Sequence, residues 1–166
     1  ELRALAVDEH DAVVGISASG RTPYVLGALE VARRAGALTV GVVCVEGSPI
    51  GAAADREIAV VVGAEVLAGS TRLKAGTAQK LVLNTISTVS MIRLGKTYGN
   101  LMVDVVATND KLRDRVRRIV EVATGASSAE VAAALDASDG DAKVAIVTLL
   151  ADVDAPTARE RLTRAG

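Results

Sequence analysis

The chain has 166 residues, of which 50% are hydrophobic and 23% are charged, and its net charge at pH 7 is −1. This length and composition predict one compact domain, alone or with a small appendage, and exclude general disorder. The neutral balance, with two Tyr as the only aromatic residues, disfavours binding of nucleic acid or of an anionic membrane surface.

Single copies of Cys and His limit the chemistry that the chain can perform by itself. They rule out an intramolecular disulfide and a zinc site built on Cys or His, and we expect no metal. Cys44 is expected to be a buried core thiol, and His10 an exposed structural residue. No apolar stretch is long enough to cross a bilayer and no signal-peptide pattern is present, so we expect a cytoplasmic protein. The first residue is Glu1 rather than Met, which predicts a chain that is processed, trimmed or cut from something longer.

The N-terminal part has the pattern of a βαβ unit. Residues 12–16 are a short, β-branched, apolar run, and residues 38–45 are a second one. Between them, Thr22 and Pro23 are typical of a helix start, and apolar residues recur at helical spacing as far as Arg34. This order predicts an α/β fold with a parallel sheet whose faces are both covered.

The remaining elements follow from the same criteria. We expect a short helical turn near 50–54, a third strand at 57–62 and a long helix at 71–94, and residues 102–106 fit a strand or a helix equally well. Later helices are expected at 110–124, 127–135, 141–151 and 154–166. The expected division is a partial α/β domain over 1–107, a connecting helix over 108–125 and a small three-helix bundle over 126–166.

The loop that follows the first strand is the strongest local feature. Its sequence, SASGRT, runs from Ser17 to Thr22 and leads directly into a helix. Hydroxyls, backbone N–H groups and the positive end of the helix dipole favour a bound phosphate there. The loop matches neither the P-loop nor the dinucleotide fingerprint. The alternative interpretation is an ordinary Ser-rich helix cap.

A second cluster of polar residues runs from Glu65 to Lys80. Glu65 could act as a general base or bind a sugar hydroxyl; alternatively, it is a loop carboxylate paired with Arg72 or Lys74. Lys80 is more typical of a solvated or interface position than of a catalyst. The basic run in residues 111–118 is interleaved with Asp and Glu, which indicates a solvated face.

Longer motifs resemble a known family. The loop resembles the phosphate loop of the sugar isomerase (SIS) domain superfamily. The string GAEVLAGSTRLKAGTAQKLVLN, at 63–84, is similar to the signature of the N-acetylmuramic acid 6-phosphate etherases, and GNLMVD (99–104) and ATNDKL (107–112) continue the likeness. The resemblance covers nearly the whole chain and implies a partial, three-layer, parallel-sheet SIS domain followed by a helical bundle.

The resemblance also implies a function. Etherases of this family are cytoplasmic lyases of cell-wall recycling and amino sugar catabolism. They release D-lactate from N-acetylmuramic acid 6-phosphate and leave N-acetylglucosamine 6-phosphate, using two Glu residues and no metal or other cofactor. The intact enzyme is expected to be a homodimer. The motifs that bear both catalytic Glu residues precede Glu1 in the family, so no catalytic residue is assigned in this chain, and the fragment alone is expected to be inactive.

Matching the phosphate loop assigns the phosphate to Ser17, Ser19 and Thr22, with Ala18 and Gly20 contributing backbone N–H groups. Further substrate contacts are expected from four residues: Arg21, Glu65, Ser70 and Lys74. The sequence departs from many relatives at Val45-Glu46, which puts that loop contact in doubt. Two alternatives stay open, namely a non-catalytic sugar-phosphate-binding regulatory module and a sugar-phosphate isomerase.

Overall fold

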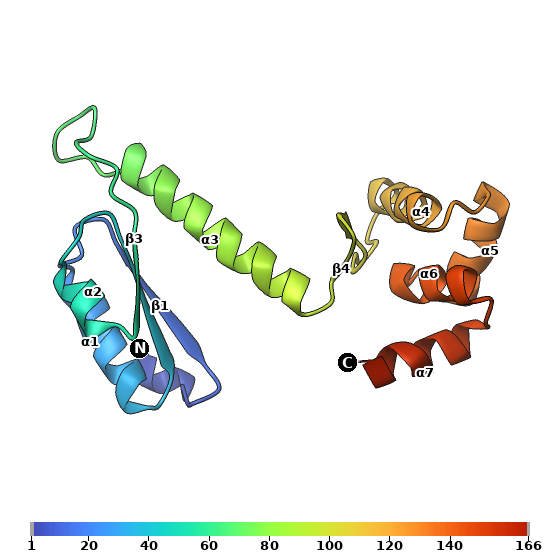
Figure 1. Ribbon diagram of the computed structural model, residues 1–166, viewed down its shortest axis with the longest axis horizontal. Coiled ribbons are helices and arrows are strands. Elements are labelled where there is room, and N and C mark those ends of the chain that lie inside the picture. Colours follow the sequence, from blue (N-terminus) through green and yellow to red (C-terminus); the bar gives the residue numbers. More distant parts are fainter. Residues whose placement is uncertain (1, 166) are drawn as a thin grey trace. The chain divides into compact units, whose positions relative to one another are not determined.

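The computed structural model describes residues 2–165, which divide into two compact units between Ser87 and Thr88 (Figure 1). The first unit contains, in chain order, η1 (Leu2–Leu5), β1 (Ala12–Ser17), α1 (Pro23–Arg34), β2 (Leu38–Val43), α2 (Pro49–Ala53) and β3 (Arg56–Ala59). The long helix α3 (Lys74–Arg93) starts in this unit and crosses its boundary. The expected α/β class is therefore confirmed. The finer division at 107 and 125 stays a prediction.

The sheet is parallel throughout, in the order β1-β2-β3. Ser17 pairs with Val43, and Val43 pairs with Ala59, so the three carboxyl ends meet at one edge. The predicted third strand, 57–62, is shorter in the structure because β2 ends at Val43 and offers no ladder beyond it. One hydrogen bond, from the amide of Val60 to the carbonyl of Val43 at 2.8 Å, closes the pairing.

Two glycines let the helices pack closely on one face of the sheet. A Cβ on Gly15 would lie 2.7 Å from Cγ1 of Val25 in α1, and one on Gly41 would lie 3.0 Å from Cγ2 of Ile50 in α2. Leu29, Val43 and Ile50 form the buried core at this interface. This packing holds α1 and α2 against the sheet.

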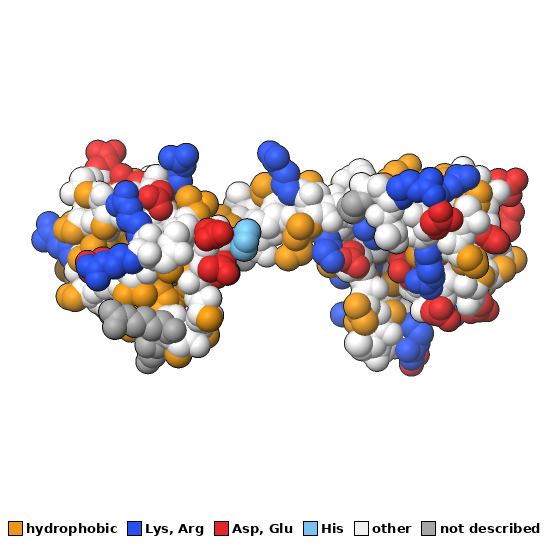
Figure 2. Space-filling model, turned by 90° about the horizontal axis from the view of Figure 1, so that it is seen from below, with side chains coloured by type: hydrophobic (Ala, Val, Ile, Leu, Met, Phe, Trp, Pro, Cys, Tyr) orange, Lys and Arg blue, Asp and Glu red, His pale blue; other side chains and the backbone are white. Residues whose placement is uncertain are grey.

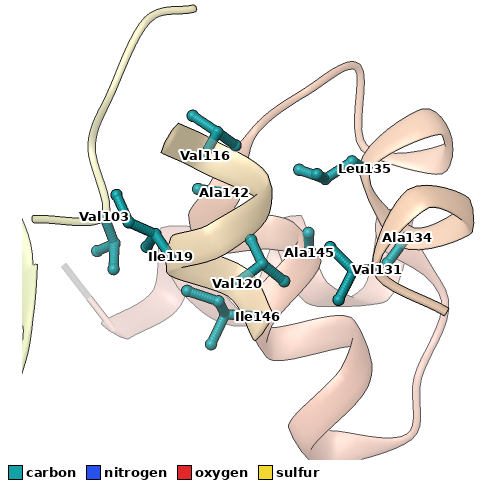
Figure 3. Packing of buried hydrophobic residues seen from close by; sticks show 10 residues of the cluster. All are labelled: Val103, Val116, Ile119, Val120, Val131, Ala134, Leu135, Ala142, Ala145 and Ile146. Atoms are coloured by element: carbon teal, nitrogen blue, oxygen red, sulfur yellow. The ribbon is translucent and has the colours of Figure 1, made fainter. Parts of the chain in front are cut away.

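The second unit contains a short hairpin and a helical bundle. The hairpin pairs β4 (Thr97–Tyr98) with β5 (Leu101–Met102), and the helices are α4 (Asp110–Thr124), α5 (Ser128–Ala137), α6 (Ala142–Ala151) and α7 (Ala155–Ala165). Side chains of α4, α5 and α6 interlock in its core together with Val103 (Figure 3). Residues 102–106, open from the sequence, finish this hairpin and continue without regular structure.

The helix starts of the bundle follow from capping residues. Asn109, Ser127 and Asp141 accept hydrogen bonds from the first turns of α4, α5 and α6, and Ser127 forms a reciprocal capping box with Glu130. All four predicted helices are confirmed, with shifts of no more than a few residues at their ends.

The surface position of His10 is also confirmed. Its side chain is exposed, and Figure 2 shows the chain's one imidazole on the surface beside acidic side chains. Its amide donates to Oδ1 of Asp8 at 2.9 Å, so the segment before β1 is a local turn.

Candidate functional site

The Ser17–Thr22 loop lies at the carboxyl edge of the sheet, between β1 and α1. Gly20 adopts a left-handed conformation, with φ of 65°. Its amide donates to the carbonyl of Ser17 at 3.2 Å and to the Ser17 hydroxyl at 3.1 Å. The loop is therefore a tight turn that folds back on the last residue of β1. The N–H of Gly20, which the family resemblance assigns to the phosphate, is used inside the loop.

Three hydroxyls meet in this turn. Oγ of Ser17 lies 2.8 Å from Oγ1 of Thr22 and 3.4 Å from Oγ of Ser19. Ser17 is buried, whereas Ser19 and Thr22 are exposed. Thr22 occupies the N-cap position of α1, yet its side chain makes no capping hydrogen bond because it pairs with Ser17. The hydroxyls are thus gathered into one group, two of them open to solvent.

Backbone donors surround the hydroxyls. The amides of Ser19, Arg21 and Thr22 have no hydrogen-bond acceptor within residues 2–165. Pro23 supplies no N–H at the first position of α1, and the positive end of the helix dipole lies at the same place. Unpaired amides and hydroxyls at a helix N-terminus are the donors that a phosphate group needs. Arg21 is exposed beside them and makes no ion pair with any described residue.

Glu65 has a different surrounding from the one expected. Its two carboxylate oxygens accept hydrogen bonds from the amides of Lys74 and Ala75, at 3.0 and 3.1 Å. The Lys74 ammonium donates to the carbonyl of Ala64 at 2.7 Å, and no ion pair joins Glu65 to Arg72 or Lys74 in the described structure. Glu65 therefore caps α3, which explains why the helix begins at Lys74 rather than at residue 71. Ser70, half-buried, lies in the loop between them.

Cys44 lies between the two polar clusters. Its amide donates to the carbonyl of Ala18 at 3.1 Å, and its Sγ contacts the carbonyl of Ala75 at 4.0 Å. Cys44 is buried, with 7% of the residue exposed, which agrees with the expected core position. Burial raises the pKa of Cys44, and the nearby charge of Glu65 raises it further. The Ser17–Thr22 loop and the capped start of α3 are thus both in contact with one residue.

Ser48 is the residue that sequence reasoning missed. Its side chain is 3% exposed, caps α2 by accepting from the amide of Gly51 at 3.0 Å, and lies directly against Gly20. A Ser followed by Pro49 is a recognisable helix start, so the cap itself had a signal. The contact with Gly20 had none, because it depends on how β1 and β2 pair.

Within residues 2–165, no three side chains of the His, Cys, Asp or Glu type are grouped to hold an ion. No helix of the described chain is long and apolar enough to span a membrane.

The described geometry is that of a parallel α/β unit with a turn rich in hydroxyls and unpaired amides after its first strand. Residues 3–88 match the SIS domain family, and the chain belongs to that family.

The chain is also similar in sequence to individual proteins. The chain is 63% identical over all of its 166 residues to the N-acetylmuramic acid 6-phosphate etherase of Streptomyces coelicolor, and covers 53% of that protein. It is 67% identical over 162 residues to the etherase of Rubrobacter xylanophilus and 53% identical over 166 residues to that of Escherichia coli, covering 54% and 56% of them. The predicted resemblance to the etherases is confirmed, and the chain spans about half the length of these relatives.

Proposed function

We propose that this chain is part of an N-acetylmuramic acid 6-phosphate etherase, in which it holds the 6-phosphate of the sugar. The observation that carries the proposal is the Ser17–Thr22 loop, which combines solvent-open hydroxyls with unpaired amides at the start of α1. The identity to etherases extends over the entire chain, which supports a common substrate rather than a shared fold alone.

The residues divide the work as follows. We assign the phosphate to the hydroxyls of Ser17, Ser19 and Thr22. Because Ser17 and Thr22 are hydrogen-bonded to each other, one of their two hydroxyl protons is used in that pair, and the other one and that of Ser19 are left for the phosphate. Arg21 adds positive charge beside them. The amides of Ser19, Arg21 and Thr22 complete the anion site. Gly20 holds the turn through its bonds to Ser17, and the carbonyl of Ala18 accepts from the amide of Cys44 outside the loop. Charge-assisted hydrogen bonds of this kind contribute about 1.5–3 kcal/mol each, so several of them fix one end of the substrate firmly.

The start of α3 forms the other side of the proposed site. Glu65, Ser70 and Lys74 are the candidates for contact with the sugar. Because both oxygens of Glu65 accept from helix amides, we assign to Glu65 the role of orienting this edge rather than that of a catalytic base. Neither a metal nor another cofactor has a part in the proposed reaction.

The proposed reaction is an elimination followed by hydration. In the ring-opened sugar a base removes the C2 proton, the C3–oxygen bond breaks, and D-lactate leaves with its oxygen protonated by an acid. Water then adds across the new double bond to give N-acetylglucosamine 6-phosphate. Two carboxyl groups in different environments suit the base and acid roles. In our proposal both belong to segments outside these 166 residues, and the isolated chain is inactive.

We further propose that the intact enzyme is a cytoplasmic homodimer that acts in peptidoglycan recycling. Helix α3 supports the dimer, because its apolar side chains lack cover within the described structure. Leu81 is 55% exposed and Ile92 is 50% exposed, and Ala75 is the one buried residue among those described in the helix. A second subunit would bury this surface.

One observation favours a second candidate, a sugar-phosphate-binding regulatory module without turnover. Glu65, the carboxylate that the sequence brings to the site, is engaged in capping and leaves no free base there. A sugar-phosphate isomerase would share the phosphate loop, but the etherase string at 63–84 disfavours it.

Turnover separates these functions. The intact protein is incubated with N-acetylmuramic acid 6-phosphate, and D-lactate is measured with D-lactate dehydrogenase. The etherase proposal expects stoichiometric D-lactate. Binding of the phosphosugar without release of lactate would support the regulatory module, and interconversion of aldose and ketose phosphates would support an isomerase.

A further inference from the structure

The loop after β2 holds the Ser17–Thr22 loop at two backbone points. The amide of Cys44 donates to the carbonyl of Ala18 at 3.1 Å, and the amide of Ile50 donates to the carbonyl of Gly20 at 3.0 Å. Val43, the last residue of β2, and Ile50, in the first turn of α2, are fully buried in the core between sheet and helices. The Ser17–Thr22 loop is therefore hydrogen-bonded to a segment that is anchored in the core at both ends.

Ser48 lies between Cys44 and Ile50 in the chain and packs against Gly20. A Cβ placed on Gly20 would lie 2.2 Å from Cβ of Ser48 and 2.4 Å from its Oγ, so the two residues are in close contact. The Ser48 side chain is itself fixed, because its Oγ accepts the amide of Gly51 as the cap of α2. The Cβ and Oγ of Ser48 therefore form a fixed wall against the backbone of Gly20.

We propose that Ser48 is a positioning residue for phosphate binding, acting through Gly20; this rests on the proposed function of the loop. The wall holds Gly20 in its left-handed conformation, from which the Gly20 amide donates to the Ser17 hydroxyl. That hydroxyl in turn pairs with Thr22. Without the wall, Gly20 gains access to the many conformations open to glycine, and the donors around it lose their preorganised arrangement.

Two substitutions at this position separate the wall from the cap. Ser48→Gly removes the wall, while glycine remains an acceptable N-cap; Ser48→Ala keeps the Cβ that faces Gly20 but is a poor N-cap. The two variants should therefore rank in opposite order when thermal stability and phosphosugar binding are compared. Thermal stability falls from wild type to Ser48→Gly to Ser48→Ala, whereas the KM for the phosphosugar is highest in Ser48→Gly and near wild type in Ser48→Ala.

The assay uses the intact protein, with KM and kcat for N-acetylmuramic acid 6-phosphate and the inhibition constant for inorganic phosphate. We expect Ser48→Gly to raise KM and the phosphate inhibition constant by about tenfold, with kcat within about twofold, because ground-state binding is what is lost. Ser127→Gly is the matched control, since it alters the same type of cap on α5 in the other unit and leaves both constants unchanged.

The results distinguish the two levels of the proposal. Suppose that wild-type protein releases D-lactate. The role of Ser48 is then overturned, and the etherase function stands, if KM is unchanged in Ser48→Gly or is raised more in Ser48→Ala, the less stable variant, than in Ser48→Gly. If wild-type protein neither releases lactate nor binds phosphate, the proposed function of the loop fails first. A tenfold change in both constants confined to Ser48→Gly supports the positioning role.

Discussion

Replacement of Gly20 by alanine tests the close packing between the Ser17–Thr22 loop and Ser48. The left-handed φ of 65° disfavours any Cβ, at a cost of about 1–2 kcal/mol. The new methyl group would also overlap Ser48, with distances of 2.2 and 2.4 Å, and approach Cγ1 of Val43 at 3.3 Å. Overpacking of a core typically costs about 1–3 kcal/mol. We expect Gly20→Ala to lower the free energy of unfolding by about 2–5 kcal/mol in total.

A nearby glycine provides the control for the conformational part. Gly47 has a similar φ of 63°, but a Cβ there would meet no heavy atom within 4 Å. Gly47→Ala should therefore lose only about 1–2 kcal/mol. The difference between the two variants isolates the steric overlap.

A double-mutant cycle with Ser48→Gly completes the measurement. By itself this change should cost roughly a few tenths of a kcal/mol, since glycine is tolerated at an N-cap. In combination it removes the overlap and leaves the backbone strain, so the coupling energy should reach about 1–3 kcal/mol. Urea unfolding of the intact protein, followed by far-ultraviolet circular dichroism, gives these values. A Gly20→Ala variant no less stable than Gly47→Ala, or a coupling energy near zero, would show that Gly20 and Ser48 are not tightly packed.

The remaining predictions concern four further residues. Ser19→Ala should weaken binding of the phosphosugar by about 1.5–3 kcal/mol, measured by calorimetry, and unchanged affinity would remove Ser19 from the site. Glu65→Ala should destabilise the protein by about 1–2 kcal/mol because α3 loses its cap, with Glu65→Gln intermediate; equal melting temperatures for all three proteins would contradict this. Hydrogen bonds from the Thr39 hydroxyl and amide, together with Arg33, hold the pKa of Asp55 below its usual value. Ionised Asp55 therefore stabilises the fold at pH values above its unfolded pKa of about 3.9, and this contribution is lost as the pH falls through the lower pKa of the folded state. Asp55→Asn should make the free energy of unfolding less dependent on pH on the acid side. Cys44 should react with Ellman's reagent far more slowly in the native than in the urea-unfolded protein, because burial raises its pKa and covers Sγ; equal rates would show that the thiol is accessible.

Local signals explain where the sequence predicted the fold well. Thr22 and Pro23 define the start of α1, and the helix runs over Pro23–Arg34 as expected. Asn109 does the same for α4, which begins at Asp110. Each of these boundaries depends on residues within one turn of the helix end, so short-range patterns are sufficient.

Tertiary pairing explains where prediction stopped. The length of β3 depends on where β2 ends. The start of α3 depends on Glu65, whose carboxylate accepts hydrogen bonds from the first turn of the helix across an irregular loop. The sequence indicated the hydroxyls of the candidate site, which lie on one short segment. The contact of Ser48 with Gly20 depends on the register of two strands, so no local pattern contains it.

Phosphate binding by the Ser17–Thr22 loop is tested by titrating the ¹⁵N-labelled intact protein with N-acetylglucosamine 6-phosphate and, separately, with N-acetylglucosamine. If the loop holds the phosphate, the phosphorylated sugar shifts the amide resonances of Ser19, Arg21 and Thr22 and the unphosphorylated sugar does not. Saturable binding of the phosphosugar that leaves these three amides unmoved would contradict it.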